Sequence, residues 1–72
     1  MESLQKDVGL RLKESRQVKK MTQAQVAALL YMTQQQYSRF ENGVFELNYQ
    51  QLVFLCKLYD VSSDYILGLS GF

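Results

Sequence analysis

The sequence predicts an all-α fold, a compact bundle of five short helices, on the basis of three observations. The chain of 72 residues contains no proline, so that residue interrupts no helix. Apolar residues recur at spacings of three and four, and no alternating run of useful length indicates a strand. Hydrophobic residues make up 47% of the chain, which is enough for one core, and the length favours a single domain over residues 1–72.

The first helix is expected to begin after Ser3, whose hydroxyl is a suitable N-cap. Lys19 and Lys20 stand near its expected end, where basic side chains suit the helix dipole. Three apolar residues recur every four positions and therefore lie on one face of this helix: Leu4, Val8 and Leu12.

The second and third helices are expected to be short and closely spaced. Thr22 is a suitable N-cap for the second helix, and Thr33 for the third, which runs from Gln34 to about Asn42. Gly43 is expected in the left-handed conformation just past this end. The apolar residues of the second helix are Val26, Ala27, Leu29 and Leu30.

The last two helices follow an irregular link. Asn48 is expected to cap the fourth helix. Either Ser62 or Ser63 caps a short fifth helix, which Gly68 ends. Five residues of the fourth helix are expected to face inward: Tyr49, Leu52, Leu55, Cys56 and Tyr59.

About three residues separate the second helix from the third. This link suits a sharply crossed pair, a helix-turn-helix over about residues 22–42, and Ala27 is small enough for the crossing. Tyr37 and Phe40 are three apart, so they share a face that is expected to look inward, while Gln36 falls between the faces. The outward face then carries Gln34, Gln35, Ser38 and Arg39.

Uncharged amides at the start of the third helix favour base recognition in DNA. In a helix-turn-helix the second helix of the pair lies in the major groove with its N-terminal residues nearest the bases. A glutamine amide matches the donor and acceptor of adenine, and an arginine further along reaches guanine or a phosphate. The ordinary alternative is that glutamine is simply a good helix former on a solvated face. The capped turn, the inward aromatics and Arg39 favour the DNA interpretation.

The charge distribution is compatible with one face meeting phosphates. The formal net charge is only +1, but residues 1–40 carry +4 and residues 41–72 carry −3. An asymmetry of this size is common in small domains, so by itself it is weak support.

The composition argues against several other classes of protein. The chain has no histidine, and Cys56 is its only cysteine, so neither an internal disulfide nor a Cys/His zinc site can form. The usual catalytic constellations are missing as well, and no enzyme activity, metal, cofactor or small-molecule site is expected. No apolar run approaches a membrane span and the start lacks a secretory signal, which favours a cytoplasmic protein with no membrane partner.

At two places the sequence resembles a known family. The stretch MTQAQVAALLYMTQQQYSRFENG resembles the lambdoid-phage repressors, the Cro/repressor or XRE-like family of helix-turn-helix DNA-binding domains. TQQ followed by ENG is especially similar to the phage 434 type of repressor. The tail YDVSSDYILG resembles the family's usual ending, in which a fifth helix closes the core. The resemblance covers about residues 8–68.

The resemblance implies roles for particular residues. Gln34 and Gln35 match base-reading positions, and Gln23 matches a glutamine that holds a phosphate. Arg16 and Glu41 match a pair that ties the first helix to the end of the third, for which the alternative is a plain surface ion pair worth about 0–1 kcal/mol. When the other residues on the outward face of the third helix are added, four residues are expected to read bases: Gln34, Gln35, Ser38 and Arg39. The expected backbone contacts are Arg16, Thr22, Gln23, Thr33, Gln36 and Asn42.

The sequence also departs from the family pattern. Tyr31 stands where the family usually has glycine, so the turn must tolerate a large side chain. Tyr37 replaces the usual isoleucine or valine, and its hydroxyl needs a partner or access to water. The link after Gly43 has no basic residue for the minor groove, which predicts modest affinity per monomer.

The expected function is that of a sequence-specific double-stranded DNA-binding transcriptional regulator. A repressor acting as a homodimer on a two-fold operator is the main hypothesis, and the alternative is an antitoxin-like or phage-regulator interaction module that keeps the fold with weak or no DNA binding. The predicted dimer surface comprises Phe54, Leu58, Tyr65, Leu69 and Phe72. The alternative for that surface is that Leu69 or Phe72 folds back over Phe54 within one monomer.

Overall fold

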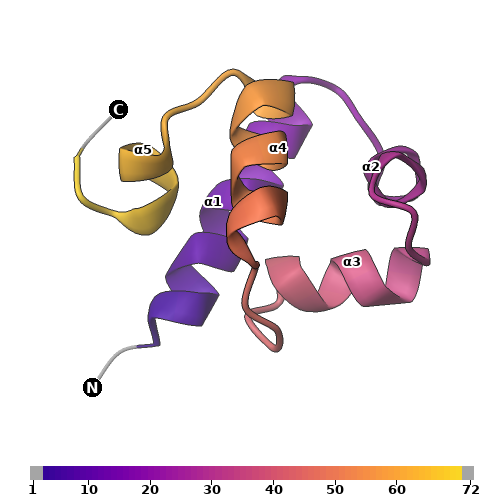
Figure 1. Ribbon diagram of the computed structural model, residues 1–72, viewed down its shortest axis with the longest axis horizontal. Coiled ribbons are helices and arrows are strands. Elements are labelled where there is room, and N and C mark those ends of the chain that lie inside the picture. The colour runs from indigo at the N-terminus through magenta and orange to yellow at the C-terminus, as the bar shows by residue number, and fades with distance from the viewer. Residues whose placement is uncertain (1–2, 71–72) are drawn as a thin grey trace.

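The computed structural model describes residues 3–70, and within them the chain forms five helices and no strand, which confirms the predicted all-α fold. The long helices α1 and α4 run through the centre, with α5 on one side and α2 and α3 on the other (Figure 1). α2 is seen end-on while α3 lies in the plane, so the two helices of the motif cross steeply (Figure 1). The helices are α1 (Leu4–Val18), α2 (Gln23–Leu29), α3 (Gln34–Glu41), α4 (Tyr49–Tyr59) and α5 (Ser63–Leu67).

Each helix begins with a side-chain cap, as the sequence predicts. Every cap accepts a hydrogen bond from the backbone N–H three residues later, which satisfies one of the unpaired donors of the first turn. In α2, α3 and α4 a glutamine at that third position also accepts from the backbone N–H of the cap, completing a capping box. The caps are Ser3, Thr22, Thr33, Asn48 and Ser62.

The core is drawn from all five helices. Tyr37 and Phe40 are buried in it, as expected, and Ala27 of α2 is buried with them. The prediction that Tyr49 faces inward is wrong, because this first residue of α4 lies beyond the core and is 89% exposed. Leu4, the first residue of α1, is likewise 59% exposed. The buried apolar residues are Leu12, Val26, Ala27, Tyr37, Phe40, Leu55, Tyr59 and Ile66.

A glycine brings the end of α3 against α1. A Cβ atom at Gly9 would collide with the backbone carbonyl oxygens of Phe40 and Glu41. Because those carbonyls belong to the last turn of α3, the absent side chain at Gly9 sets how closely the two helices approach. Just after α3, Gly43 has a φ of 74°, the left-handed conformation that the sequence predicts there. The close contact at Gly9 fixes the position of α3 relative to α1.

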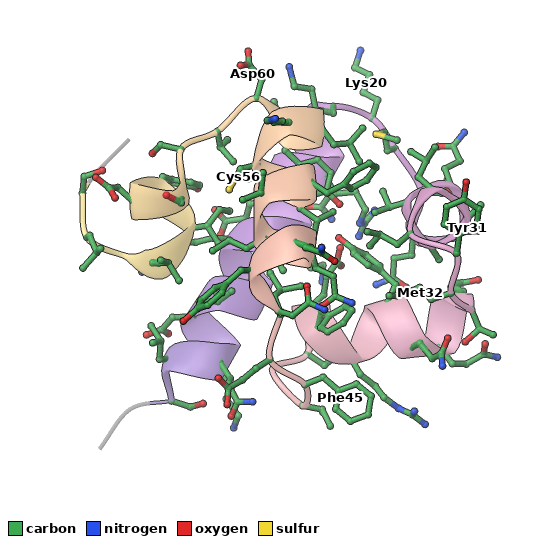
Figure 2. All side chains as sticks on the ribbon, viewed as in Figure 1. Lys20, Tyr31, Met32, Phe45, Cys56 and Asp60 are labelled. Carbon is green, nitrogen blue, oxygen red and sulfur yellow. The ribbon has the colours of Figure 1, made fainter. Side chains whose placement is uncertain are left out.

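The turn between α2 and α3 contains a strained residue. Tyr31 has a φ of 57°, in the left-handed region that a residue with a Cβ enters only at a cost. Its side chain is 97% exposed and lies on the outside of the turn (Figure 2), so packing does not offset that cost. The turn is closed by backbone hydrogen bonds from Tyr31 to Ala28 and from Met32 to Ala27. The large side chain is thus tolerated because it projects into solvent.

Replacing Tyr31 with Gly is expected to raise the free energy of unfolding by about 0.5–1 kcal/mol. Relief of the left-handed strain, about 1–2 kcal/mol, exceeds the added entropy of a glycine in the unfolded chain. Urea unfolding monitored by circular dichroism measures the change. Tyr31→Ala is the matched control, because it removes the ring and keeps the Cβ atom that causes the strain. A Tyr31→Gly protein no more stable than Tyr31→Ala contradicts this account of the turn.

Candidate nucleic-acid interface

The outward face of α3 and the start of α2 form one polar surface. Gln34, Gln35 and Arg39 are exposed, and Ser38 is half-buried beside them. Together with Gln23 of α2 they line a wide, open hollow. The structure therefore brings the four residues expected to read bases onto one surface with a residue expected to hold a phosphate.

A chain of hydrogen bonds orients the amides on this surface. The Gln23 Nε2 donates to Glu41 Oε1 at 3.0 Å, and the Gln34 Nε2 lies 3.5 Å from Gln23 Oε1, a long hydrogen bond. An ionised carboxylate only accepts, so Glu41 turns the nitrogen of Gln23 inward and its oxygen outward. The Oε1 of Gln23 in turn accepts from the Nε2 of Gln34 and so orients the Gln34 amide. Gln34 keeps its Oε1 and one N–H group free, which is the acceptor and donor pair that adenine requires.

Glu41 is the buried centre of this network. The Arg16 Nε donates to Glu41 Oε2 at 2.7 Å and the Arg16 Nη2 to Oε1 at 3.1 Å, so the two residues expected to pair form a bidentate ion pair. Arg16 also donates from Nη1 to the Met21 carbonyl at 2.9 Å. Three of its five N–H groups are thereby used, and two remain for a phosphate. Only 5% of Glu41 is exposed, which distinguishes this pair from an ordinary surface ion pair.

The surroundings of Glu41 keep its carboxyl ionised. Burial alone would raise the pKa of the Glu41 carboxyl, but hydrogen bonds from Arg16, Tyr37 and Gln23, with the charge of Arg16, hold the pKa below its usual range. The same partners raise the pKa of the Arg16 guanidinium, chiefly through the hydrogen bond with Glu41. Both groups are therefore charged at neutral pH, and the amide orientation that depends on Glu41 is fixed there.

The hydroxyl of Tyr37 has the buried partner that it needs. Its oxygen lies 2.5 Å from that of Tyr59, and both rings are almost fully buried. Burial raises the pKa of Tyr59 to about 12 and that of Tyr37 further, so both phenols stay neutral. The pair connects α3 with the last turn of α4, and it compensates for the polar atom that Tyr37 introduces into the core.

The residues expected at the DNA backbone lie at helix ends. Thr22 and Thr33 accept capping bonds through their hydroxyl oxygens, so each hydroxyl hydrogen remains available to a phosphate. Gln36 accepts from the Thr33 backbone N–H through Oε1 and keeps its amide nitrogen for another acceptor. Asn42 donates to the Ser38 hydroxyl at 3.2 Å. Each of the capping side chains thus retains a donor of the kind that phosphate oxygens accept.

Sequence reasoning missed two contacts at this surface. It assigned Gln23 to a phosphate without its bond to Glu41, and it left the link after α3 without a role. In the structure the guanidinium carbon of Arg39 lies 5.3 Å from the ring centroid of Phe45 in that link. The only signal that the sequence offered was an aromatic residue in the link, Phe45, six positions after a basic residue, Arg39.

The predicted dimer surface is only partly exposed. Phe54 is 38% exposed and Leu69 is 74% exposed. Leu58 and Tyr65 are partly buried and pack against the core. Phe72 lies outside the described residues. Sequence reasoning missed Val53, next to Phe54 on α4 and 52% exposed.

Across residues 3–70, no three side chains of the histidine, cysteine, aspartate or glutamate type gather closely enough to hold a metal ion. None of the helices in this range combines the length and the apolar character that crossing a membrane requires.

Comparison with known proteins identifies the family. A helix-turn-helix family model matches residues 12–66. The chain is 38% identical over 60 residues to the uncharacterized HTH-type transcriptional regulator YobD of Bacillus subtilis (strain 168), covering 83% of this chain and 54% of that protein. It is 39% identical over 56 residues to the uncharacterized HTH-type transcriptional regulator YqaE of the same organism, covering 78% of this chain and 48% of that protein.

The chain spans about half the length of the curated relatives that it matches. No solved structure gives a significant match. The family model covers most of the chain, including both helices of the motif and the core residues from Leu12 to Ile66. The chain therefore belongs to the helix-turn-helix family of the XRE/Cro type, whose members include HTH-type transcriptional regulators.

Proposed function

We propose that this chain is a sequence-specific double-stranded DNA-binding domain of a transcriptional repressor, and that residues 1–72 form one such domain. The observation that carries the proposal is the exposed face of α3, where Gln34, Gln35 and Arg39 surround an open hollow beside Gln23. A helix of this kind enters the major groove, and its first amides meet base edges there. Family members are typically non-enzymatic, and the proposed action needs no cofactor.

Salt-dependent binding to duplex DNA tests this function. Fluorescence anisotropy with a labelled random duplex and with a duplex enriched by selection, at several salt concentrations, gives both affinities. Phosphate contacts release counterions, so affinity for both duplexes is expected to fall as salt rises. The enriched duplex is expected to bind at least about 10³-fold more tightly at equal salt. Equal affinities, or no binding at low salt, contradict the proposal.

A protein-interaction module is the second candidate function. The low net charge and several exposed apolar residues outside α3 favour it, among them Val44, Tyr49 and Val53. Such a module would bind duplex DNA weakly or not at all, even at low salt, and would prefer no sequence, since it offers its surface to a protein rather than to phosphates. The anisotropy titration therefore separates the two functions.

We propose further that the chain acts as a homodimer through α4 and the segment after α5. Val53, Phe54 and Leu69 expose apolar surface there. A two-fold pair would set its recognition helices about 34 Å apart, one turn of DNA.

Phe54→Lys is expected to dissociate this dimer without unfolding the chain. A lysine at the interface would bury an unpaired charge, while Phe54 is not one of the buried core residues. Sedimentation velocity at several concentrations measures the association, and circular dichroism checks the fold. Val18→Lys, at a 76% exposed position on α1, is the matched control for the added charge. A wild-type chain that stays monomeric at high concentration, with and without DNA, refutes the dimer.

A further inference from the structure

Arg39 is supported by an aromatic ring rather than by an acidic partner. Its guanidinium carbon lies 5.3 Å from the ring centroid of Phe45, within the range of a cation–π contact. Among residues 3–70 no carboxylate forms an ion pair with Arg39, and no hydrogen bond uses its side chain. Its five N–H groups are therefore free for a ligand, while the ring contact favours one position of the guanidinium.

Phe45 is itself anchored from two directions. Its ring meets the ring of buried Phe40 edge to face, with centroids 6.3 Å apart, and Phe40 meets Tyr37 in the same way. The backbone N–H groups of Val44 and Phe45 both donate to the Arg39 carbonyl, at 2.8 and 3.2 Å. The link that carries Phe45 closes beneath the C-terminal part of α3 (Figure 2). One residue thus joins the core to the exposed guanidinium.

This arrangement prepares Arg39 for a flat, paired contact. A free arginine side chain has many rotamers and loses that freedom when it binds, whereas a side chain already held in place loses less. The guanidinium carbon lies over the ring, and the N–H groups of Arg39 have no partner within residues 3–70, so they can pair with a guanine, which presents O6 and N7 side by side. Phe45 remains 43% exposed, so it supports the arginine without covering it.

We propose that Phe45 is a positioning residue that aims the Arg39 guanidinium at a guanine in the major groove. The inference rests on the proposed function and names a specificity determinant outside the recognition helix. It assigns a role to the link after α3, which has no basic residue of its own. The predicted consequence is a preference for guanine at one base pair that depends on both residues together.

The test compares Phe45→Leu, Phe45→Tyr, Arg39→Ala and the double variant Phe45→Leu/Arg39→Ala on the enriched and random duplexes. Leucine keeps apolar volume without a π face, and tyrosine restores the face. Phe45→Leu is expected to weaken binding to the enriched duplex about two- to fivefold and to leave the random duplex unchanged, since no charge is lost. Phe45→Tyr is expected to bind as wild type, and Phe45→Leu is expected to have no effect once Arg39 is alanine.

Two outcomes of the DNA-binding measurements overturn the inference. One is a Phe45→Leu protein that binds the enriched duplex as wild type does, and the other is an equal loss with and without Arg39. Val44→Ala, at the neighbouring exposed position of the link, is the control for a general change in this segment and is expected to bind as wild type.

A measurement on the free protein separates this inference from the proposed function. The ring current of Phe45 should shift the NMR resonances of the Arg39 side-chain protons upfield in wild type and in Phe45→Tyr, and not in Phe45→Leu. A missing shift overturns the inference whatever the chain does with DNA. A wild-type chain that prefers no duplex over another contradicts the proposed function, whatever the shift is.

Discussion

Replacing Glu41 with Ala is expected to lower the free energy of unfolding by about 3 kcal/mol or more. The substitution leaves the Arg16 guanidinium, only 11% exposed, without its bidentate partner, and unpaired buried charges cost this much. It also removes the acceptor of Gln23 and the support of the last turn of α3 against α1. A domain of this size has a total free energy of unfolding of about 4–11 kcal/mol, so the loss is a large part of it.

Urea unfolding of four proteins measures this effect: wild type, Glu41→Ala, Arg16→Met, and the double variant. The double variant is expected to be more stable than the sum of the two single losses predicts, because removing both charges leaves neither unpaired. Glu41→Gln is the matched control, since it keeps the shape and its amide oxygen can still accept the hydrogen bond from Gln23 Nε2. If Glu41→Ala lowers the free energy of unfolding by less than about 1 kcal/mol and shows no coupling to Arg16→Met, the pair is no more than an ordinary surface ion pair.

The same pair predicts how stability depends on pH. The folded pKa of Glu41 lies below the value of about 4.3 expected in the unfolded chain, because its hydrogen bonds outweigh burial. Its stabilisation is therefore complete above that pH and is lost as the pH falls through the folded pKa. In urea titrations between pH 7 and pH 3, wild type should lose more stability than Glu41→Gln does, which lacks the titrating group.

Replacing Gln34 with Ala is expected to lower affinity for the enriched duplex by about 1–3 kcal/mol and to leave the random duplex nearly unchanged. The amide of Gln34 keeps an acceptor and a donor free, and a paired contact to one base is worth this much. An amide neutralises no phosphate, so the salt dependence should not change either. Gln35→Ala is expected to act in the same way at a neighbouring base pair.

Arg39→Ala is the contrasting variant in the same anisotropy titrations. It removes a charge as well as a base contact, so it is expected to weaken binding to both duplexes, more strongly for the enriched one, and to reduce the salt slope by about one phosphate. If Gln34→Ala instead weakens both duplexes equally, the base-reading role assigned to this residue is wrong.

Local hydrogen bonding explains why the helix starts could be predicted from the sequence. Thr22, Thr33 and Asn48 each cap through an atom three residues from its partner, so the signal lies within one short stretch. The periodicity of apolar residues predicted burial correctly only where another helix covers that face of the helix. It placed Leu55 and Tyr59 correctly and failed at Tyr49, because the spacing continues to the end of α4 while the core does not.

The contacts that shape the site depend on residues that are distant in the sequence. The bond from Gln23 to Glu41 joins positions 18 residues apart, and no spacing rule indicates it. The pairing of Tyr37 with Tyr59 could be anticipated only as the need for some partner. The contact of Arg39 with the Phe45 ring depends on how the link turns back after Gly43. The pattern of hydrophobic residues does not determine that turn.

Selection from a random duplex library with wild type and Gln34→Ala in parallel tests the central claim, that α3 reads bases through the amide of Gln34. Wild type is predicted to enrich one short half-site, repeated in inverted orientation about 10 base pairs apart. Gln34→Ala is predicted to enrich the same site with the preference lost at one base pair in each half. Libraries that remain random with wild type, or an identical site with Gln34→Ala, would contradict the account.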